Sequence, residues 1–251
     1  MENNKIIYYK QLDSTNTKLS ELAAAGAEHG TIVVADLQTA GKGRRGRIWE
    51  SPAGENIYMS MLLKPTFEAN IAPMLTLCMA YSVAKVLQSQ GFPDVRIKWP
   101  NDLIIGGKKI CGILTEMKMK DSQIDYVIIG VGINVNTKEF PEELVDKATS
   151  LYLVSNREMK RQTLIDEVIT QFESVYQQFC EEKDLSFLQD EYNKLLINQG
   201  KEVRVLEPEK EYNACAEGIN AKGELLVRME DGTQKEIYAG EVSVRGVYGY
   251  V

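Results

Sequence analysis

Short apolar runs separated by turn residues dominate the first half of the chain, and they predict the strands of one sheet. Runs of four to nine residues that are bounded by Gly, Pro, Asn or Asp are typical of strands. The predicted strands cover residues 5–9, 31–36, 56–64, 95–99, 103–105, 110–117 and 126–134. Gly106 and Gly107 form a tight turn, so that Lys108 and Lys109 open the strand that returns from it. Residues 121–123 form the next turn.

A second pattern, with apolar residues three or four positions apart, predicts helices. The longest covers 160–182, and its apolar stripe consists of Ile165, Val168, Ile169, Phe172, Val175, Tyr176 and Phe179. Further helices are predicted over 73–90 and 185–197. A fourth ends near Gly26 and begins within Asp13-Ser14-Thr15-Asn16-Thr17, whose polar groups either cap the helix or bind a ligand at its N-terminus.

The pattern changes near residue 198, which is the one domain boundary that the sequence predicts. After it come short alternating strands with tight turns, over 201–206, 213–219, 224–229, 234–238 and 241–245. Five short strands in so few residues are typical of a small barrel. We therefore expect a core over 1–198 and a barrel over 199–251, with 137–151 as a mobile loop or a short helix.

Composition narrows the class of protein. The chain has 251 residues and a net charge of -7, so it is a poor general nucleic-acid binder. The four cysteines have no CxxC spacing, which indicates reduced thiols rather than disulfides or a zinc site. His29 is the only histidine, which argues against a histidine triad or a multi-histidine metal site. No run of transmembrane length and no signal-peptide pattern was found, so we expect a cytoplasmic protein without a membrane partner.

The stretch 38–49, called the basic loop below, is positively charged although the chain as a whole is negative. Four cations, Lys42, Arg44, Arg45 and Arg47, lie within six positions, and three glycines are placed among them. Guanidinium groups match phosphate oxygens in geometry, and glycine allows the backbone to approach a ligand closely. The loop lacks the Walker A pattern. A solvated surface loop is the plainer interpretation, but the predicted strands on both sides would hold this loop at a fixed place on a sheet.

Three further features of the sequence are ambiguous when each is taken alone. Lys98-Trp99-Pro100-Asn101-Asp102 places a lysine and an aspartate close together, which could be a surface ion pair of little energetic value. Lys109 could likewise be an ordinary hairpin residue. Gly130-Val131-Gly132-Ile133-Asn134 ends a strand with two glycines and a polar residue.

In this order, these groups resemble the biotin protein ligases. The resemblance rests on 13–16, on Gly41-Lys42-Gly43-Arg44-Arg45-Gly46-Arg47-Ile48-Trp49, on 98–102, on 109–114 and on 130–134. It implies an α+β fold, with a mixed-sheet catalytic core of the biotin/lipoate ligase type and a small SH3-like barrel after it. Two departures are visible. Lys42 stands where arginine is common, and lysine lacks the planar, forked donor geometry of a guanidinium. In addition, no N-terminal helix-turn-helix module precedes the core.

The resemblance also implies a reaction. Biotin and ATP would react to biotinyl-5′-AMP with the help of Mg²⁺, and a lysine of a biotin carboxyl carrier domain would then accept the biotinyl group. DNA is not expected as a partner, and the resemblance leaves a homodimer open. It names no metal ligand.

The same resemblance assigns roles to residues of this chain. It assigns the biotin site to Ser14, Thr15, Asn16, Gln38, Lys42, Gly43, Arg44, Lys109, Gly112 and Leu114. It assigns the ATP and adenylate site to Arg44, Arg45, Arg47, Trp49, Asn101, Asn134 and Arg245. It assigns catalytic roles to Lys109, Arg44, Arg47 and Asp102. Asp102 would orient either the acceptor amine or a Mg²⁺-bound water.

Two alternatives remain at this stage. A lipoate or octanoate ligase shares the architecture and the mixed-anhydride chemistry, but does not typically carry the basic glycine loop together with 98–102. A noncatalytic nucleic-acid-binding module would use the cations of 42–47, and the acidic balance of the chain argues against it.

Overall fold

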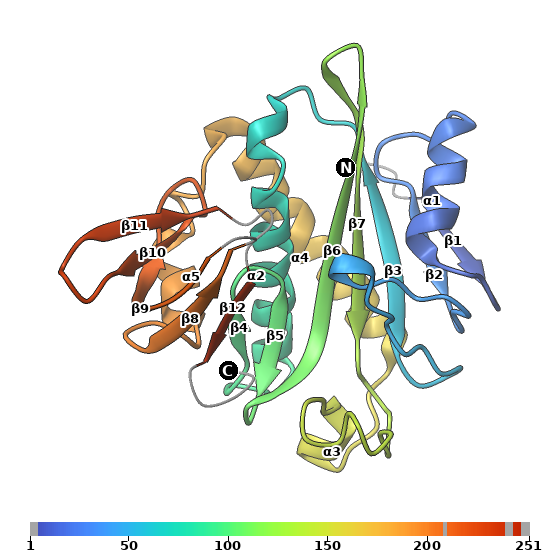
Figure 1. Cartoon of the computed structure of the whole chain (residues 1–251). Helices are drawn as coiled ribbons and strands as arrows, with labels where there is room; N and C mark the ends of the chain where they lie inside the picture. The colour runs from blue at the N-terminus through green and yellow to red at the C-terminus, as the bar shows by residue number, and fades with distance from the viewer. Residues whose placement is uncertain (1–4, 208–209, 239–242, 247–251) are drawn as a thin grey trace.

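The computed structural model describes residues 5–207, 210–238 and 243–246, and for 243–246 it describes the backbone. Its larger part is a seven-stranded mixed sheet in the order β1-β2-β3-β7-β6-β5-β4 (Figure 1). The strands are β1 (Ile6–Tyr9), β2 (Ile32–Ala35), β3 (Ile57–Leu63), β4 (Arg96–Lys98), β5 (Asp102–Ile105), β6 (Lys108–Lys120) and β7 (Gln123–Ile133). The β1–β2 pair is parallel and the other pairs are antiparallel, which confirms the predicted mixed sheet.

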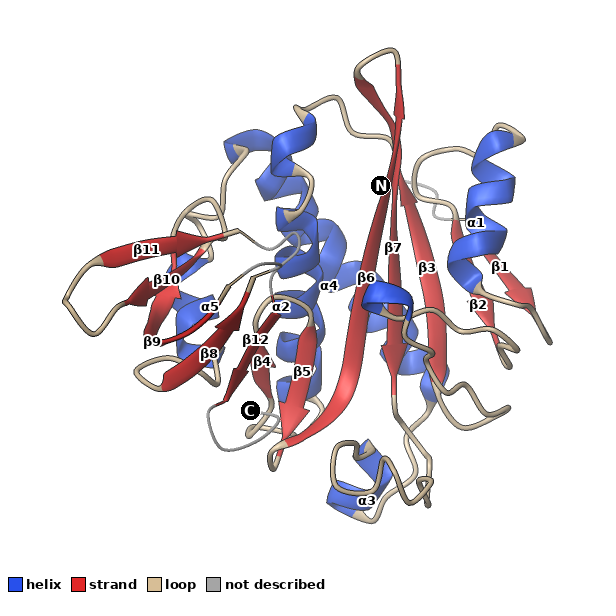
Figure 2. Ribbon diagram, in the orientation of Figure 1, coloured by secondary structure: helices blue, strands red, loops and turns tan. Residues whose placement is uncertain are grey.

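Two long helices cover one face of this sheet (Figure 2). These are α2 (Met74–Ser89) and α4 (Arg161–Glu182), and their apolar stripes pack against alternate residues of the strands, such as Met61 and Ile129, to form the main core. The opposite face carries the short helix α1 (Thr15–Ala24) over Leu62 and Ile128. Because α1 covers only part of that face, the rest of it is free to form a site.

A second, smaller sheet follows the short helix α5 (Gln189–Leu195). Its strands are β8 (Glu202–Leu206), β9 (Glu211–Ile219), β10 (Leu225–Arg228), β11 (Gln234–Ile237) and β12 (Ser243–Gly246), in the antiparallel order β11-β10-β9-β8-β12. The expected C-terminal module of short strands is thus confirmed. Within the described ranges β11 and β12 form its two edges. The main core extends without a break from α2 into this sheet, through residues such as Val203 and Leu225.

Two expected elements differ in detail. The strands β6 and β7 reach to Lys120 and begin at Gln123, so their hairpin is longer than the apolar pattern predicted. It extends beyond the core, where charged side chains alternate with Met117 and Met119, and the pairing of the two strands replaces burial as the reason for strand structure. The stretch 137–151 is a turn-rich loop, and the helix near it is α3 (Leu151–Ser155), capped by the Ser150 side chain, which accepts from the Leu153 amide at 3.1 Å.

The expectation that no run reaches transmembrane length is wrong by the criteria of length and composition. Among the described residues, the stretch Ala69–Ser89 meets both criteria. Most of its apolar window, 67%, is buried inside the protein, because this stretch includes α2, which packs against the large sheet and α4. Its hydrophobicity is that of a core helix.

Candidate active site

The candidate site lies on the face of the large sheet that α1 leaves uncovered. On β3 and β7, the residues that continue the α1 face are Ser60 and Gly130, followed by Tyr58 and Gly132. On β6, Gly112 lies directly opposite Gly132. Apart from Tyr58, small residues therefore replace the large apolar ones where the helix ends, and a hollow forms above the strands.

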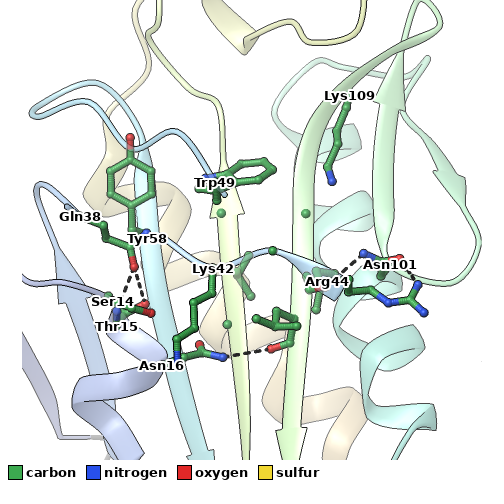
Figure 3. Close-up of a pocket in the computed structure, with 17 residues that line it drawn as sticks. Ser14, Thr15, Asn16, Gln38, Lys42, Arg44, Trp49, Tyr58, Asn101 and Lys109 are labelled. Atoms are coloured by element: carbon green, nitrogen blue, oxygen red, sulfur yellow. Dashed lines mark hydrogen bonds between the residues drawn. The ribbon is translucent and has the colours of Figure 1, made fainter. Parts of the chain in front are cut away.

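A hydrogen-bonded network of buried polar groups closes one end of this hollow, at the N-terminus of α1. The Thr15 amide and hydroxyl donate to Gln38 Oε1 at 2.9 and 3.2 Å (Figure 3). The fully buried Ser60 hydroxyl lies 2.7 Å from Thr15 Oγ1 and 2.6 Å from Asn16 Oδ1. Asn16 Nδ2 donates to Glu116 Oε2 at 2.6 Å. The polar groups at this helix start therefore face a cavity, and no side-chain cap is formed by Ser14.

The same network continues into the basic loop. Gln38 Nε2 donates to Ser51 Oγ at 2.9 Å, and the Ser51 hydroxyl donates to the carbonyl of Trp49 at 2.9 Å. Gly41 permits this contact, because a Cβ at Gly41 would lie 2.4 Å from the Trp49 carbonyl oxygen. Trp49 is thus tied through its backbone to the polar end of the hollow.

The indole of Trp49 lies over the glycines of the sheet. A Cβ at Gly132 would lie 2.5 Å from Trp49 Cε2, and one at Gly112 would lie 2.9 Å from Trp49 Cζ3. Trp49 Nε1 is buried without a protein hydrogen-bond partner. The Lys109 ammonium lies 5.1 Å from the ring centroid, within the range of a cation–π contact.

Lys109 opens β6 as predicted, and its ammonium group lies 2.7 Å from Asp102 Oδ1. Asn101 Nδ2 donates to the same oxygen at 3.0 Å, and Asn101 Oδ1 accepts from Arg44 Nη1 at 2.7 Å. Asn101 and Asp102 therefore hold the two cations on one side of the hollow. Figure 3 shows Arg44, Asn101 and Lys109 on that side. Burial lowers the pKa of the Arg44 guanidinium, and the charges of Arg45 and Arg47 lower it further, whereas Asp102 raises it.

The basic loop has internal structure. The Gly43 amide donates to Arg47 O at 2.8 Å, and the Trp49 amide donates to Gly41 O at 2.9 Å. Between them Arg44–Gly46 form one 3₁₀ turn, in which Arg45 takes a left-handed conformation with φ 57°. As a result, Arg44 points to the strands, whereas Arg45 and Arg47 are exposed.

These residues line a first cavity, which is open to solvent. All ten residues that the resemblance assigned to biotin line it: Ser14, Thr15, Asn16, Gln38, Lys42, Gly43, Arg44, Lys109, Gly112 and Leu114. Trp49 and Asn101, which were assigned to the nucleotide, line it too. Sequence reasoning missed Tyr58 and the buried Ser60, because single polar residues inside an apolar strand carry no local signal.

A second cavity, also open to solvent, lies between the basic loop and the stretch 137–148. It is lined by Arg47, Trp49 and Asn134 from the predicted nucleotide site, and by Phe140 and Lys147, which had not been singled out. Asn134 also holds the end of the loop 137–151, because its Nδ2 donates to Thr149 O at 3.1 Å. Three residues border both cavities: Gln38, Trp49 and Lys109.

One predicted nucleotide residue, Arg45, is exposed and lies outside both cavities, and the side chain of another, Arg245, is not described. Arg245 lies on β12, paired with Arg204 on β8, and its side chain is outside the described part of the structure. Within the described ranges, no group of three or more His, Cys, Asp or Glu side chains is placed to hold a metal ion.

Comparisons with known proteins agree with this geometry. The model of the Biotin/lipoate A/B protein ligase family matches residues 8–134, and that of the Biotin protein ligase C terminal domain matches residues 200–245. The bifunctional ligase/repressor BirA of Bacillus spizizenii is 37% identical over 243 residues, which are 95% of this chain and 74% of that protein. A biotin--[acetyl-CoA-carboxylase] ligase of Paracoccus denitrificans is 38% identical over 125 residues, 49% of this chain and 51% of that protein.

The fold is also similar to solved structures. The biotin protein ligase from Aquifex aeolicus, in complex with biotin and ATP, superposes with a TM-score of 0.85 and 33% identity, over 97% of this chain and 100% of that chain. The same protein without ligand gives a TM-score of 0.82 and 31% identity. Together with both family matches, these similarities show that the chain belongs to the biotin/lipoate A/B protein ligase family and, within it, to the biotin protein ligases.

Proposed function

We propose that this chain joins biotin and ATP to biotinyl-5′-AMP, and then transfers the biotinyl group to a lysine of a biotin carboxyl carrier domain. The observation that carries the proposal is the pair of cavities that meet at Lys109 and Trp49. A reaction between two bound substrates needs two adjacent pockets with positive charge at the junction. The similar Aquifex aeolicus ligase has been solved in complex with biotin and ATP.

Biotin would occupy the first cavity with its ureido ring at the α1 end. That ring presents one carbonyl acceptor and two N–H donors, and Ser14, Thr15, Asn16 and Gln38 offer groups of both kinds. The glycines at 112, 130 and 132 let Lys109, Asn16 and Trp49 lie close against the sheet, so these side chains would border the acyl chain. The carboxylate end would then lie near Lys109 and the cations of the basic loop.

Adenylate formation requires a carboxylate to approach the α-phosphate of ATP. A carboxylate oxygen forms a bond to the α-phosphorus, and the bond to the bridging oxygen breaks, so that pyrophosphate leaves with the electron pair. Lys109 and Arg44 offset the repulsion between the two anions and stabilise the charge that spreads over the phosphate oxygens. Because Asn101 and Asp102 hold these cations in place beforehand, little reorganisation is needed during the reaction.

The nucleotide would occupy the second cavity. Trp49 offers an aromatic face to adenine, Asn134 an amide, and Arg47 a charge for the phosphates. Asn101 is better suited to hold Arg44 than to bind ATP directly, given the 2.7 Å contact between them. Arg45 and Arg245 would need to approach the nucleotide from the exposed side of the loop and from β12, and their roles stay predictions.

In the second step, the carrier lysine attacks the carbonyl carbon of the mixed anhydride, an amide bond forms, and AMP leaves with the electrons of the cleaved bond. Asp102 lines neither cavity, but it pairs with Lys109, which borders both, and this pairing supports a role for Asp102 in orienting the amine. A Mg²⁺-bound water is the other role that the sequence left open.

Mg²⁺ would enter with ATP, because it is usually held by substrate phosphates and only one or two carboxylates. The second cavity contains Glu50, Glu55 and Glu139 as such carboxylates. The residues present therefore fit a phosphate-bound ion. The free thiols of Cys78, Cys111, Cys180 and Cys215 are consistent with work in the reducing cytoplasm. A homodimer stays a prediction.

The test is the mass of a carrier domain after incubation with the protein, biotin and Mg-ATP. We expect one biotinyl group per carrier, no change without ATP, and no change in a carrier whose acceptor lysine is replaced by arginine. Pyrophosphate release with lipoate or octanoate but not with biotin would instead identify a ligase for those acids.

A further inference from the structure

Trp99 lies between two active-site residues and the C-terminal sheet, and the mechanism above gives it no role. Its side chain is 2% exposed, and its Nε1 donates to the Gly223 carbonyl oxygen at 3.0 Å. This hydrogen bond is buried and joins residues 124 positions apart. A phenylalanine would fill much of the same space without a buried donor, so the N–H group makes a specific connection between the two sheets.

The acceptor of this bond is fixed by its own turn. Asn220 Oδ1 accepts from the amides of Lys222 and Glu224 at 3.0 Å each, and the Gly223 amide donates to Asn220 O at 2.9 Å. Gly223 takes φ +74°, which favours glycine, and a Cβ there would lie 3.0 Å from Leu77 on α2. The turn 220–224 therefore presents the Gly223 carbonyl in a defined direction.

The chain that follows the donor residue, Trp99, leads directly into the active site. Asn101 and Asp102 follow Trp99 by two and three residues, and they hold Arg44 at 2.7 Å and Lys109 at 2.7 Å. The Asn101 backbone is itself fixed to β6, because the Ile113 amide donates to Asn101 O at 2.9 Å. A shift of the 99–101 turn would therefore displace both Arg44 and Lys109.

We infer that Trp99 is a positioning residue, through which the C-terminal sheet sets the place of Asn101 and Asp102 and so of Arg44 and Lys109. This inference rests on the proposed function for its kinetic consequence. It means that the turn 220–224 contributes to adenylate formation without contact with either substrate. Biotin's ureido ring, bound at the α1 end by Thr15 and Gln38, would be little affected.

The first test is Trp99→Phe, measured by pyrophosphate release from biotin and Mg-ATP. Small displacements of catalytic groups cost up to about a hundredfold in rate, so we expect kcat to fall by about tenfold or more while the Kd of biotin changes less than threefold. Equilibrium dialysis measures how many biotin molecules bind per chain. A value of one shows that the variant is folded and keeps its site. Asn220→Ala, which loosens the turn from its outer side, should lower kcat in the same direction.

The matched control is Gln189→Met. Gln189 Nε2 donates to Ile219 O at 2.9 Å, so the variant also removes one hydrogen bond to the C-terminal sheet, but this bond involves neither Gly223 nor residues 99–102. We expect a similar loss of thermal stability and a wild-type kcat. Equal losses of kcat in Trp99→Phe and Gln189→Met would overturn the inference and leave a general stabilising role.

A double-mutant cycle with Asn101→Ala separates positioning from bulk packing. If Trp99 acts through Asn101, the double variant should be about as slow as Asn101→Ala alone, because coupled residues are not additive. Multiplicative losses, or a wild-type kcat in Trp99→Phe, would overturn the inference.

Hydrogen exchange gives a readout that does not depend on the reaction. In Trp99→Phe without ligand, the Ile113 amide should exchange at least tenfold faster, and in Gln189→Met it should exchange as in the wild type. Unchanged Ile113 exchange in Trp99→Phe would contradict the inference even in an active enzyme. If the wild-type protein releases no pyrophosphate with biotin, the proposed function fails, and this measurement still decides whether Trp99 holds Asn101.

Discussion

The Lys109 ammonium lies 2.7 Å from the Asp102 carboxylate, at the point where the two cavities meet. Both side chains are largely buried, with 23% and 14% exposed. An ion pair at the surface would contribute little to stability. Here the pair holds a positive charge where the two cavities meet. This position favours a catalytic role for Lys109 over that of an ordinary hairpin residue, which the sequence left open.

Lys109→Met should lower the rate of adenylate formation far more than biotin affinity. The substitution keeps much of the stem but removes a charge that is needed most in the transition state. A charge-assisted contact contributes about 1.5–3 kcal/mol, which corresponds to roughly tenfold to a hundredfold in rate. Pyrophosphate release measures this step, and transfer from synthetic biotinyl-AMP to the carrier should be less impaired.

Lys108→Met is the matched control for that change. Lys108 is the adjacent residue, and its Nζ donates to Val145 O at 2.7 Å in an exposed contact. We expect a rate within threefold of the wild type. A Lys109→Met enzyme that forms the adenylate as fast as Lys108→Met would exclude Lys109 from the first step.

Gly130→Ala and Gly132→Ala should affect different substrates, although they lie two residues apart on β7. A Cβ at Gly130 would lie 2.2 Å from Asn16 Oδ1, and one at Gly132 would lie 2.5 Å from Trp49 Cε2. Alanine at 130 should therefore displace the ureido-binding amide and raise the KM for biotin. Alanine at 132 should displace the indole and raise the KM for ATP.

Each glycine variant serves as the control for the other in steady-state kinetics. Both introduce one methyl group on the same strand face, so a shared loss of stability would change both enzymes alike. We expect shifts of tenfold or more in the affected KM, since displacement of one well-placed contact costs about 1–3 kcal/mol. Identical kinetic changes in the two variants would contradict the assignment of the two cavities.

Much of the fold was predictable because its signals are local. Apolar runs, the Gly106-Gly107 turn and the helical stripe of α4 each depend on neighbouring positions, and they predicted most strands and helices. The basic loop could be recognised in the sequence because its four cations lie close together in an acidic chain. The order of the strands and the division of the sheet face between α1 and the site depend on contacts between distant segments, which no local pattern encodes.

The polar support of the site was not predictable for the same reason. Ser60 contacts Thr15 and Asn16 across more than forty positions, and Ser51 matters because it reaches both Gln38 and the Trp49 carbonyl. In the sequence each is an ordinary serine within or beside an apolar strand. Their importance follows from burial and partners, which exist only in the folded chain.

Acidification should destabilise the protein through His29 before most carboxylates are protonated. Burial lowers the pKa of His29 below its ordinary value of 6.5, with a further lowering from Lys64. Its Nδ1 accepts from the Lys64 amide at 2.9 Å, and protonation would remove that acceptor. Because the unfolded chain binds the proton more tightly, stability is full above about pH 7 and falls as pH decreases through 6.5 toward the folded pKa.

Thermal unfolding between pH 7.5 and 5.5 measures this effect. His29→Gln does not titrate, so its melting temperature should depend less on pH over that range than that of the wild type. Parallel pH curves for the two proteins would show that other groups cause the acid sensitivity.

Binding of biotin and ATP together should slow hydrogen exchange in the basic loop. Lys42, Arg44, Arg45 and Arg47 repel one another at short range, and bound phosphate would offset that repulsion and hold the loop over the cavities. Amides of residues 42–48 should therefore gain protection when both substrates are present. The Gly43 amide should gain least, because it already donates to Arg47 O at 2.8 Å. Exchange across 42–48 that is identical with and without the substrates would show that the loop does not close over them.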